Sequence, residues 1–375
     1  MAAKKRPKCK SENTTLGFFL RRARISVGNP RVPVLAKSRP AFQRALYGWY
    51  REHARPLPWR TSPSLYKTVL SEFMLQQTQV ATVLPYFERW LVALPDFGAL
   101  AAAPAETVMN LWAGLGYYSR ARNLHRLAQA LAGRNSPPTT PDEWRELPGI
   151  GPYTAAAISS IAHAHPVACV DGNVVRVLAR LTNERREFRD NSEAATHFRP
   201  LAESLIAGSD PGEHNQAMME LGALICVRAR PRCEKCPVAS FCAARKAGDP
   251  AAPPMLKPKR YEARQVDRAW CVDRGRLLLH RADHGSKRLG GLGELPLLST
   301  VSADASGEPL LQRRRSVTRF RIVESIYSVP PGPGVKRLVR QNPELQWVRT
   351  ADLNSTPLSG PHRKWIAELL ATSGD

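Results

Sequence analysis

The sequence predicts a mainly α-helical chain that ends in a small α+β domain. From Ala41 to about Cys226, short amphipathic segments alternate with Pro, Gly and Asn breaks, which is typical of packed helices. After a Pro-rich stretch at 247–259, the period of the apolar residues becomes that of strands. The length of 375 residues fits two domains, and 43% hydrophobic residues suffice for packed cores. We therefore expect a basic arm at 1–40, a helical domain at 41–243, a linker at 244–264 and an α+β domain at 265–375.

Residues 1–40 hold eleven Lys or Arg and one acid, Glu12. This composition favours a disordered basic arm, and it also fits an over-long start or a mitochondrial transit peptide. The apolar piece Leu16–Leu20 is too short for a signal-peptide core. Scattered cysteines argue for a reducing compartment. We expect a cytoplasmic protein, nucleoid-associated if bacterial, and a mitochondrial or nuclear one only if residues 1–40 are a targeting arm.

The charge of the whole chain is strongly unbalanced. Lys and Arg number 55 against 32 Asp and Glu, which gives a net charge of +23. This predicts a polyanionic partner, most simply nucleic acid. Net charge alone does not separate DNA from RNA or from an anionic membrane. No apolar stretch reaches the roughly 18 residues of a transmembrane helix, so we expect no membrane span.

A glycine hairpin stands in the middle of the helical region, in the segment LPGIGPYTA at 147–155. Gly149 and Gly151 carry no side chain, so the backbone there can approach a phosphate closely. The N–H groups of the hairpin and of the following helix then form an anion cradle. Such contacts fix the position of a nucleic acid and carry no sequence information.

Four cysteines follow in the spacing C-x6-C-x2-C-x5-C: Cys226, Cys233, Cys236 and Cys242. Four thiolates in one short stretch indicate a metal or cluster site. The spacing lacks the separated C-x2-C pairs of a zinc ribbon and differs from the ferredoxin spacings. Zinc nevertheless remains an alternative metal that the same four thiolates could bind.

The chain resembles the MutY family of adenine DNA glycosylases, within the endonuclease III superfamily. In that superfamily this cysteine spacing is a [4Fe–4S] loop, and the hairpin is that of a helix-hairpin-helix element. The segment SEFMLQQTQV at 71–80 differs from a motif of the family only in Phe73. Further matching segments are LPWR at 57–60, PYFE at 85–88, LWAGLGYYSRARNL at 111–124, VDGNVVR at 170–176 and NQAMMELG at 215–222.

The resemblance implies two catalytic carboxylates. Asp171, oriented by Asn173, would stabilise the positive, oxocarbenium-like sugar. Glu72 would protonate N7 of a flipped adenine and then help to activate water. Taken alone, Asp-Gly-Asn is an ordinary turn with a helix cap, and a Glu on an amphipathic helix is usually a solvated residue.

The same resemblance assigns contacts to the base and to the DNA. Leu57, Trp59, Arg60 and Glu220 would line the adenine pocket. Gln77 would wedge into the duplex, and Tyr117 would intercalate beside the lesion. Arg228 and Arg230, inside the cysteine loop, would contact phosphates. The base must leave the helical stack to be reached, so base flipping is implied.

The residue that follows the hairpin decides the subclass. Bifunctional relatives carry a Lys there, whose amine forms a Schiff base and then drives strand cleavage. Here the position is Tyr153, which cannot form an imine. We expect a monofunctional glycosylase that leaves an abasic site.

The C-terminal domain resembles the MutT-like domain by which this family recognises 8-oxoguanine. GGLGELP at 290–296 resembles the family's G-L-W-E-F-P segment, with Gly293 in place of Trp. No nudix hydrolase box is present, so nucleotide hydrolysis is not expected. The family's Phe-Ser-His lesion-sensing turn aligns near Val317–Arg319, where Thr318 could replace the Ser hydroxyl. An alternative is a β-rich domain that only adds basic surface through Arg313, Arg314 and Arg315.

We therefore expect an enzyme that removes adenine mispaired with 8-oxoguanine or guanine in double-stranded DNA, works as a monomer and carries a [4Fe–4S] cluster. Two other functions stay open. One is a related glycosylase for another base, such as thymine in a G·T mismatch. The other is a non-catalytic, metal-bearing DNA-binding protein, for which neither Glu72 nor Asp171 would be needed.

Overall fold

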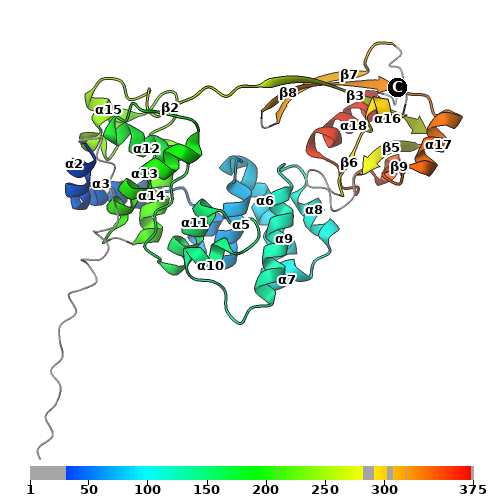
Figure 1. Ribbon diagram of the computed structural model, residues 1–375. Helices are drawn as coiled ribbons and strands as arrows, with labels where there is room; N and C mark the ends of the chain where they lie inside the picture. Colours follow the sequence, from blue (N-terminus) through cyan, green and yellow to red (C-terminus); the bar gives the residue numbers. More distant parts are fainter. Residues whose placement is uncertain (1–30, 209, 282–290, 302–306, 318, 373–375) are drawn as a thin grey trace, which may run out of the picture. The chain divides into compact units, whose positions relative to one another are not determined.

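A computed structural model describes residues 31–208, 210–281, 291–301, 307–317 and 319–372 (Figure 1). The chain forms two compact units, residues 1–57 with 155–257 and residues 58–154 with 258–375. The helical region expected at 41–243 therefore contributes to both units. Among the described residues, no helix has the length and apolar character needed to cross a membrane.

The first unit is built mainly from helices. They are α2 (Arg31–Lys37), α3 (Arg39–His53), α11 (Pro152–His163), α12 (Gly172–Thr182), α13 (Asn191–Ile206), α14 (Pro211–Leu224) and α15 (Ala243–Lys246). Asp171, Asp190 and Asp210 cap α12, α13 and α14, each accepting a backbone N–H of the first turn. The core includes Phe42 of α3 and Leu178 of α12. Capped helices thus pack apolar faces around one core.

Two boundaries of the first unit differ from the expected ones. Helix α2 lies inside the segment expected as a disordered arm, whose residues 1–30 fall outside the described part of the chain. Helix α15 runs from the end of the expected helical domain into the expected linker, and strand β2 (Met255–Leu256) lies inside that linker and pairs in parallel with β1 (Glu187–Phe188). Backbone pairing thus ties the end of the Pro-rich stretch to the helical unit, which composition could not show.

The helical part of the second unit comprises α4 (Pro58–Thr61), α5 (Leu65–Leu75), α6 (Val80–Ala93), α7 (Phe97–Ala102), α8 (Ala105–Trp112), α9 (Ser119–Ala132) and α10 (Pro141–Arg145). Pro, Gly and capping residues separate these short helices, as the break pattern predicts. Trp90 and Trp112 are fully buried with their rings edge to face, 5.5 Å apart.

The C-terminal region carries the strands that the change of period predicts. One sheet has the order β3-β8-β7, formed by Glu262–Trp270, Phe320–Ser328 and Leu311–Val317. The other joins β4 (Val272–Asp273), β5 (Arg276–Arg281) and β6 (Gly293–Glu294), with β9 (Leu345–Arg349) pairing β5. Helices α16 (Leu298–Val301), α17 (Pro333–Gln341) and α18 (Gly360–Thr372) complete the region. The turn expected at Asp273–Gly275 is confirmed, and it has positive φ at both Arg274 and Gly275.

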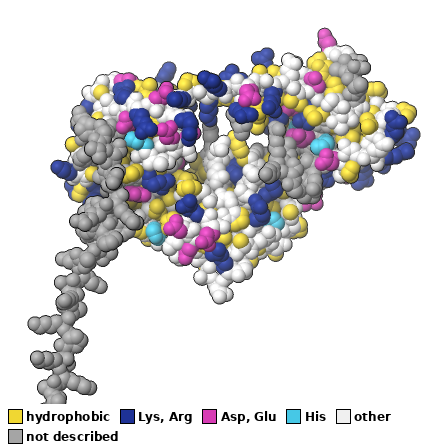
Figure 2. All heavy atoms as spheres, in the orientation of Figure 1, with side chains coloured by type: hydrophobic (Ala, Val, Ile, Leu, Met, Phe, Trp, Pro, Cys, Tyr) yellow, Lys and Arg dark blue, Asp and Glu magenta, His cyan; other side chains and the backbone are white. Residues whose placement is uncertain are grey.

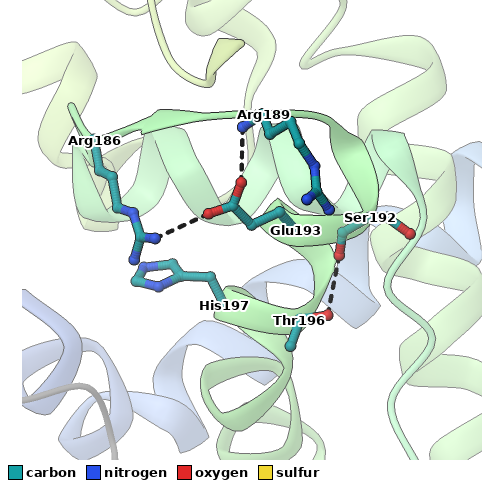
Figure 3. Close-up of a pocket in the computed structure, with 6 residues that line it drawn as sticks. All are labelled: Arg186, Arg189, Ser192, Glu193, Thr196 and His197. Carbon is teal, nitrogen blue, oxygen red and sulfur yellow. Dashed lines mark hydrogen bonds and ion pairs between the residues drawn. The ribbon is translucent and has the colours of Figure 1, made fainter. Parts of the chain in front are cut away.

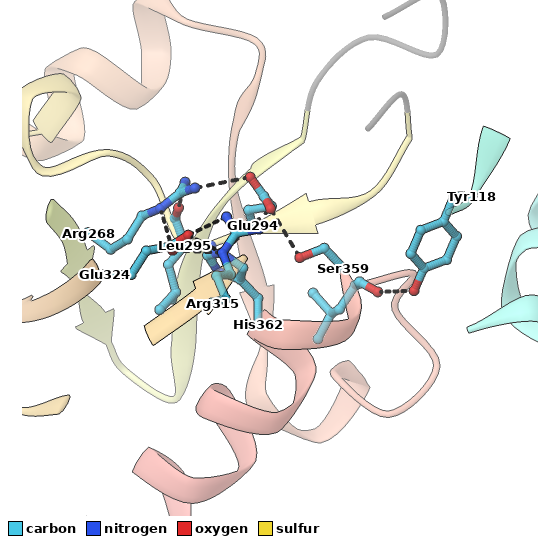
Figure 4. A network of polar contacts seen from close by, with 9 residues as sticks. Tyr118, Arg268, Glu294, Leu295, Arg315, Glu324, Ser359 and His362 are labelled. Atoms are coloured by element: carbon cyan, nitrogen blue, oxygen red, sulfur yellow. Dashed lines mark hydrogen bonds and ion pairs between the residues drawn. The ribbon is translucent and has the colours of Figure 1, made fainter. Parts of the chain in front are cut away.

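A buried charge network holds this C-terminal region together (Figure 4). Arg268 lies 3.3 Å from both Glu294 and Glu324, and Arg315 also binds Glu324. The Glu324 side chain is fully buried, and His362 lies 3.6 Å from it. Burial would raise the pKa of Glu324, but the nearby His362 and the two guanidinium charges hold it at about 2. Arg315 is therefore an internal ion-pair partner, which corrects the interpretation that it only adds basic surface.

Candidate active site

Glu72 lies on the buried side of α5. The hydroxyl of Ser64 caps this helix by accepting the N–H of Lys67 at 3.2 Å. Glu72 is 7% exposed and is followed by Phe73 and Met74, both buried. A carboxyl group taken out of water needs compensating partners, so a purely solvating residue would not be placed here. The interpretation of Glu72 as a solvated surface residue is therefore wrong.

Gln77 and Tyr117, the two residues expected to enter the duplex, both lie on exposed turns. Gln77 follows the end of α5, and Tyr117 precedes α9. Their φ angles are 56° and 48°, in the left-handed region that non-glycine residues rarely adopt. Both side chains are therefore presented from locally strained backbone.

The glycine hairpin has the backbone freedom that its sequence predicts. Gly149 has a φ of 79°, and a Cβ there would lie 2.5 Å from Cβ of Asn123. Any other residue would be strained and would displace α9. A Cβ at Gly151, by contrast, would meet nothing within 4 Å, so this position is open. Tyr153 follows in the first turn of α11 and is half-buried.

Asp171 is the N-cap residue of α12 and carries a desolvated carboxyl. Its Oδ1 accepts the N–H of Val174 at 2.8 Å, and its Oδ2 accepts the amide of Asn173 at 2.8 Å. Burial raises the pKa of Asp171, although these hydrogen bonds and the nearby charge of Arg176 act in the opposite direction. A carboxylate that is both desolvated and oriented is suited to stabilising a nearby positive charge.

Two arginines on α12 connect this carboxyl to the cysteine loop. Arg176 donates to Asn173 Oδ1 at 2.8 Å and to the carbonyl of Cys226 at 2.7 Å. Arg180, 2% exposed, donates to Sγ of Cys226 at 3.3 Å and to the carbonyl of Arg228 at 2.8 Å. Sequence reasoning missed both arginines. Their spacing of four residues on one helix could have indicated a shared face.

The cysteine loop gathers four thiols that are free of disulfide bonds. Burial raises the pKa of Cys236 to about 12, and the charges of the other three cysteines act in the same direction. The sulfurs are therefore close enough to influence one another. Arg228 and Arg230 of the same loop are exposed, as expected for phosphate contacts.

The four cysteine thiols of this loop are a donor set for a metal centre. Among the described residues, no three His, Cys, Asp or Glu side chains converge to hold one metal ion. In a [4Fe–4S] cluster each thiolate binds a different iron, so the sulfurs surround a larger centre and need not converge on one point. The donor set of four neighbouring cysteines therefore fits a [4Fe–4S] cluster.

The residues expected in the adenine pocket are mostly buried. Trp59 is 8% exposed and packs edge to face on Phe87, with ring centroids 4.9 Å apart. Leu57 is buried, Arg60 is half-buried, and Glu220 is 1% exposed. Leu57 and Glu220 belong to the first unit, whereas Trp59 and Arg60 belong to the second. The burial of each residue is therefore described within the unit to which it belongs.

Sequence reasoning missed the arginine that binds Glu220. Arg55 donates from its backbone N–H and from Nε to Oε1, at 3.1 and 2.7 Å, and from Nη2 to Oε2 at 2.9 Å. Arg55 stands two residues before the LPWR segment. No motif drew attention to it, because a charged residue beside a Pro-rich turn is usually solvated.

The expected lesion-sensing turn lies at the end of the β7–β8 hairpin. Thr318 falls outside the described residues. Arg319 lies 3.1 Å from Glu262, and its guanidinium stands 5.0 Å from the ring centroid of Phe320. Arg264 stacks on the same ring at 3.5 Å. Val317 and Arg319 thus stand where the family pattern has Phe and His, and the aromatic ring beside the turn belongs to Phe320.

A surface pocket of about 460 Å³ lies beside α13, and none of the residues expected to do chemistry lines it (Figure 3). Glu193 accepts from Arg186 at 2.9 Å and from the backbone of Arg189 at 2.8 Å. The charges that line this pocket are thus largely satisfied by one another. Elsewhere, Lys and Arg recur across the visible face of Figure 2, as the net charge predicts.

Comparison with protein-family models matches residues 70–202 to the HhH-GPD superfamily of base excision DNA repair proteins. The adenine DNA glycosylase of Rattus norvegicus is 44% identical over 215 residues, which are 54% of this chain and 42% of that protein. The adenine DNA glycosylase of Homo sapiens is 43% identical over 219 residues, 55% of this chain and 40% of that protein. The chain thus spans less than half the length of these relatives.

Among solved structures, a thermostable thymine-DNA glycosylase matches with a TM-score of 0.50 and 26% identity. The match covers 56% of this chain and 98% of that one. It confirms the mainly helical fold class that the sequence predicts.

Proposed function

We propose that the chain is a monofunctional DNA glycosylase that removes adenine mispaired with 8-oxoguanine or guanine. The match of residues 70–202 to the HhH-GPD superfamily of base excision DNA repair proteins supports the class of enzyme. The relatives named adenine DNA glycosylase support adenine as the base that is removed, since their sequence identity to this chain reaches 44%. The thymine-DNA glycosylase shares the fold at lower identity, so the fold alone does not select adenine.

The observation that carries the proposal is the desolvated, oriented carboxyl of Asp171. When the bond between sugar and base breaks, positive charge develops on the sugar ring. A carboxylate in a dry site stabilises this charge far better than one in water. Asn173 and the N–H of Val174 fix the orientation of the group before the substrate arrives. A protein that only binds a polyanion would gain nothing from a half-buried, oriented carboxylate at this position.

Glu72 supplies the proton in this proposal. A departing adenine leaves more readily once its N7 is protonated, and a positioned acid typically contributes a rate factor of about 10²–10⁴. Burial of Glu72 on α5 agrees with a role inside a closed site rather than at the surface. Tyr153 provides no amine, so water completes the reaction and the strand remains intact.

The four cysteines would hold a [4Fe–4S] cluster, whose role here would be structural: it would hold the loop at 226–242 in a fixed conformation. Arg176 and Arg180 bind the start of that loop and thereby join it to α12, the helix that Asp171 caps. The exposed Arg228 and Arg230 would then be held rigid for phosphate contacts on double-stranded DNA. Zinc is the alternative occupant, and metal analysis separates the two.

The test is single-turnover adenine release from duplexes with A opposite 8-oxoguanine, G, C or T, with and without alkali. We expect strand cleavage only after alkali, fastest opposite 8-oxoguanine and lost in Glu72→Gln. Equal rates opposite G and 8-oxoguanine would remove the recognition role of Val317–Arg319 and leave the glycosylase. Thymine release from G·T duplexes would support the related glycosylase. Binding without release of any base would support the non-catalytic alternative.

A further inference from the structure

Two exposed turns of the second unit are built on strained backbone. Gln77 and Tyr117 have φ angles of 56° and 48°. Tyr117 is 51% exposed, one of the more exposed aromatic rings among the described residues. Strain of this kind costs on the order of 1–3 kcal/mol for each residue, and it persists only where the surroundings enforce it.

One side chain enforces both turns. Arg120 is 5% exposed and lies beneath them. Its Nη1 donates to the carbonyl of Gln76 at 2.6 Å, and its Nη2 donates to Oγ1 of Thr78 at 3.1 Å, on either side of Gln77. Nη2 also donates to the carbonyl of Gly116 at 3.1 Å, immediately before Tyr117.

We call the hydrogen bonds from Arg120 to the two turns the Arg120 bracket. Further contacts of the same guanidinium extend this bracket to neighbouring residues. Nη1 reaches the carbonyls of Phe73 and Met74 at the end of α5, at 3.1 and 2.6 Å. Nη2 reaches the carbonyl of Leu115 at 3.2 Å. The guanidinium lies 5.4 Å from the ring centroid of Tyr117. One planar group therefore touches both turns and one of the two exposed side chains.

The chemistry of this position favours arginine over lysine. Among the described residues, no ion pair joins Arg120 to a carboxylate. Carbonyl and hydroxyl oxygens accept its hydrogen bonds instead and offset the cost of burying its charge. Burial lowers the pKa of Arg120 to about 10, which leaves the group charged near neutral pH. A guanidinium presents its donors in a rigid fork, whereas an ammonium is a compact point charge and cannot span two turns.

We propose that Arg120 is a positioning residue that holds Gln77 and Tyr117 as one preformed, two-pronged wedge for opening the duplex. This inference rests on the proposed function, because only a protein that flips a base out of double-stranded DNA would use such a wedge. Turns that are already ordered in the free protein lose little conformational entropy when DNA binds. Preorganisation of this kind therefore favours binding and base flipping. Arg120 itself touches neither the base nor the reacting bond.

The first test uses the free protein and needs no DNA. Hydrogen exchange of the amides at 76–79 and 115–118 is compared in the parent, Arg120→Met, Arg120→Lys and Leu127→Ala proteins. We expect exchange to rise roughly tenfold or more in both turns together for Arg120→Met and Arg120→Lys. Leu127→Ala removes a fully buried side chain of the same helix and serves as the control for general destabilisation. Unchanged exchange in either turn, an equal rise with Leu127→Ala, or full rescue by Lys would overturn the bracket.

The second test asks whether the bracket serves base flipping. In a Glu72→Gln background, 2-aminopurine replaces the target adenine opposite 8-oxoguanine, and its fluorescence reports unstacking. We expect Arg120→Met to weaken the flipping equilibrium by about tenfold or more, an effect of about 1.4 kcal/mol or more. The same change should have little further effect once Gln77→Ala and Tyr117→Ala are both present.

The outcomes separate the wedge from the proposed function. Affinity for a duplex carrying a stable abasic-site analogue, which needs no base removal from the stack, should change far less than flipping in Arg120→Met. Loosened turns with unchanged flipping, or additive effects in the combined variant, would overturn the wedge and leave the glycosylase standing. No fluorescence change in the parent with any duplex would remove the wedge together with the proposed function, while exchange would still report the bracket.

Discussion

Arg55 forms a bidentate ion pair with Glu220, with Nε 2.7 Å from Oε1 and Nη2 2.9 Å from Oε2. The Glu220 side chain is 1% exposed, whereas that of Arg55 is 34% exposed. A charge buried this deeply depends on its partner, because water cannot replace the lost contacts. The pair therefore fixes a residue expected to face the adenine.

We expect Arg55→Met to lower the free energy of unfolding by about 1–3 kcal/mol, as a buried acceptor loses its charged donor. The double variant Arg55→Met with Glu220→Gln should recover part of this loss, since no unpaired charge remains. Urea unfolding of the two single variants and the double variant measures the coupling between the residues. Additive losses would show that the pair does not act as a unit.

Asp171→Asn should stop excision while leaving the fold intact. Asn keeps an oxygen that can accept the N–H of Val174, so α12 retains its cap, but the charge is lost. We expect single-turnover excision to fall by about 10²–10³ or more, with duplex affinity nearly unchanged. Asp190→Asn is the matched control, because Asp190 caps α13 in the same way and has no expected role in chemistry. A similar loss of excision in both variants would contradict a catalytic role for Asp171.

The raised pKa of Asp171 gives a pH dependence of known sign. Burial disfavours its charged form, so the folded protein holds this proton at pH values where the unfolded chain has released it. Asp171 therefore lowers stability at neutral pH, and this penalty fades as pH falls through the folded pKa toward the unfolded one. Excision should be lost over the same range, because the protonated group carries no charge. Asp171→Asn should unfold at a higher temperature than the parent at pH 7, and the difference should shrink in acid.

Much of this arrangement was predictable from the sequence, because local chemistry decides it. Gly149 is required by its positive φ and by the nearby Asn123, and the strands after residue 260 follow from the apolar period. The long-range contacts of the buried and half-buried arginines were not predictable. Arg55, Arg120 and Arg180 bind groups far away in the chain, and nothing in their neighbouring residues distinguishes them from solvated arginines. The pairing of β1 with β2 was hidden for the same reason, since each strand has two residues and no period.

Loss of one cysteine should separate the role of the metal loop from catalysis. In Cys236→Ser, we expect iron and sulfide to fall together and duplex affinity to drop, because the loop that carries Arg228 and Arg230 loses its brace. The double variant Arg228→Ala with Arg230→Ala should keep its iron and sulfide but bind every duplex more weakly. Its dependence of affinity on salt should be shallower by about one unit of slope for each arginine that contacts a phosphate. Metal analysis and salt titrations measure both effects. Zinc in place of iron and sulfide would contradict the cluster, and an unchanged salt slope would place the phosphate contacts elsewhere on the basic surface.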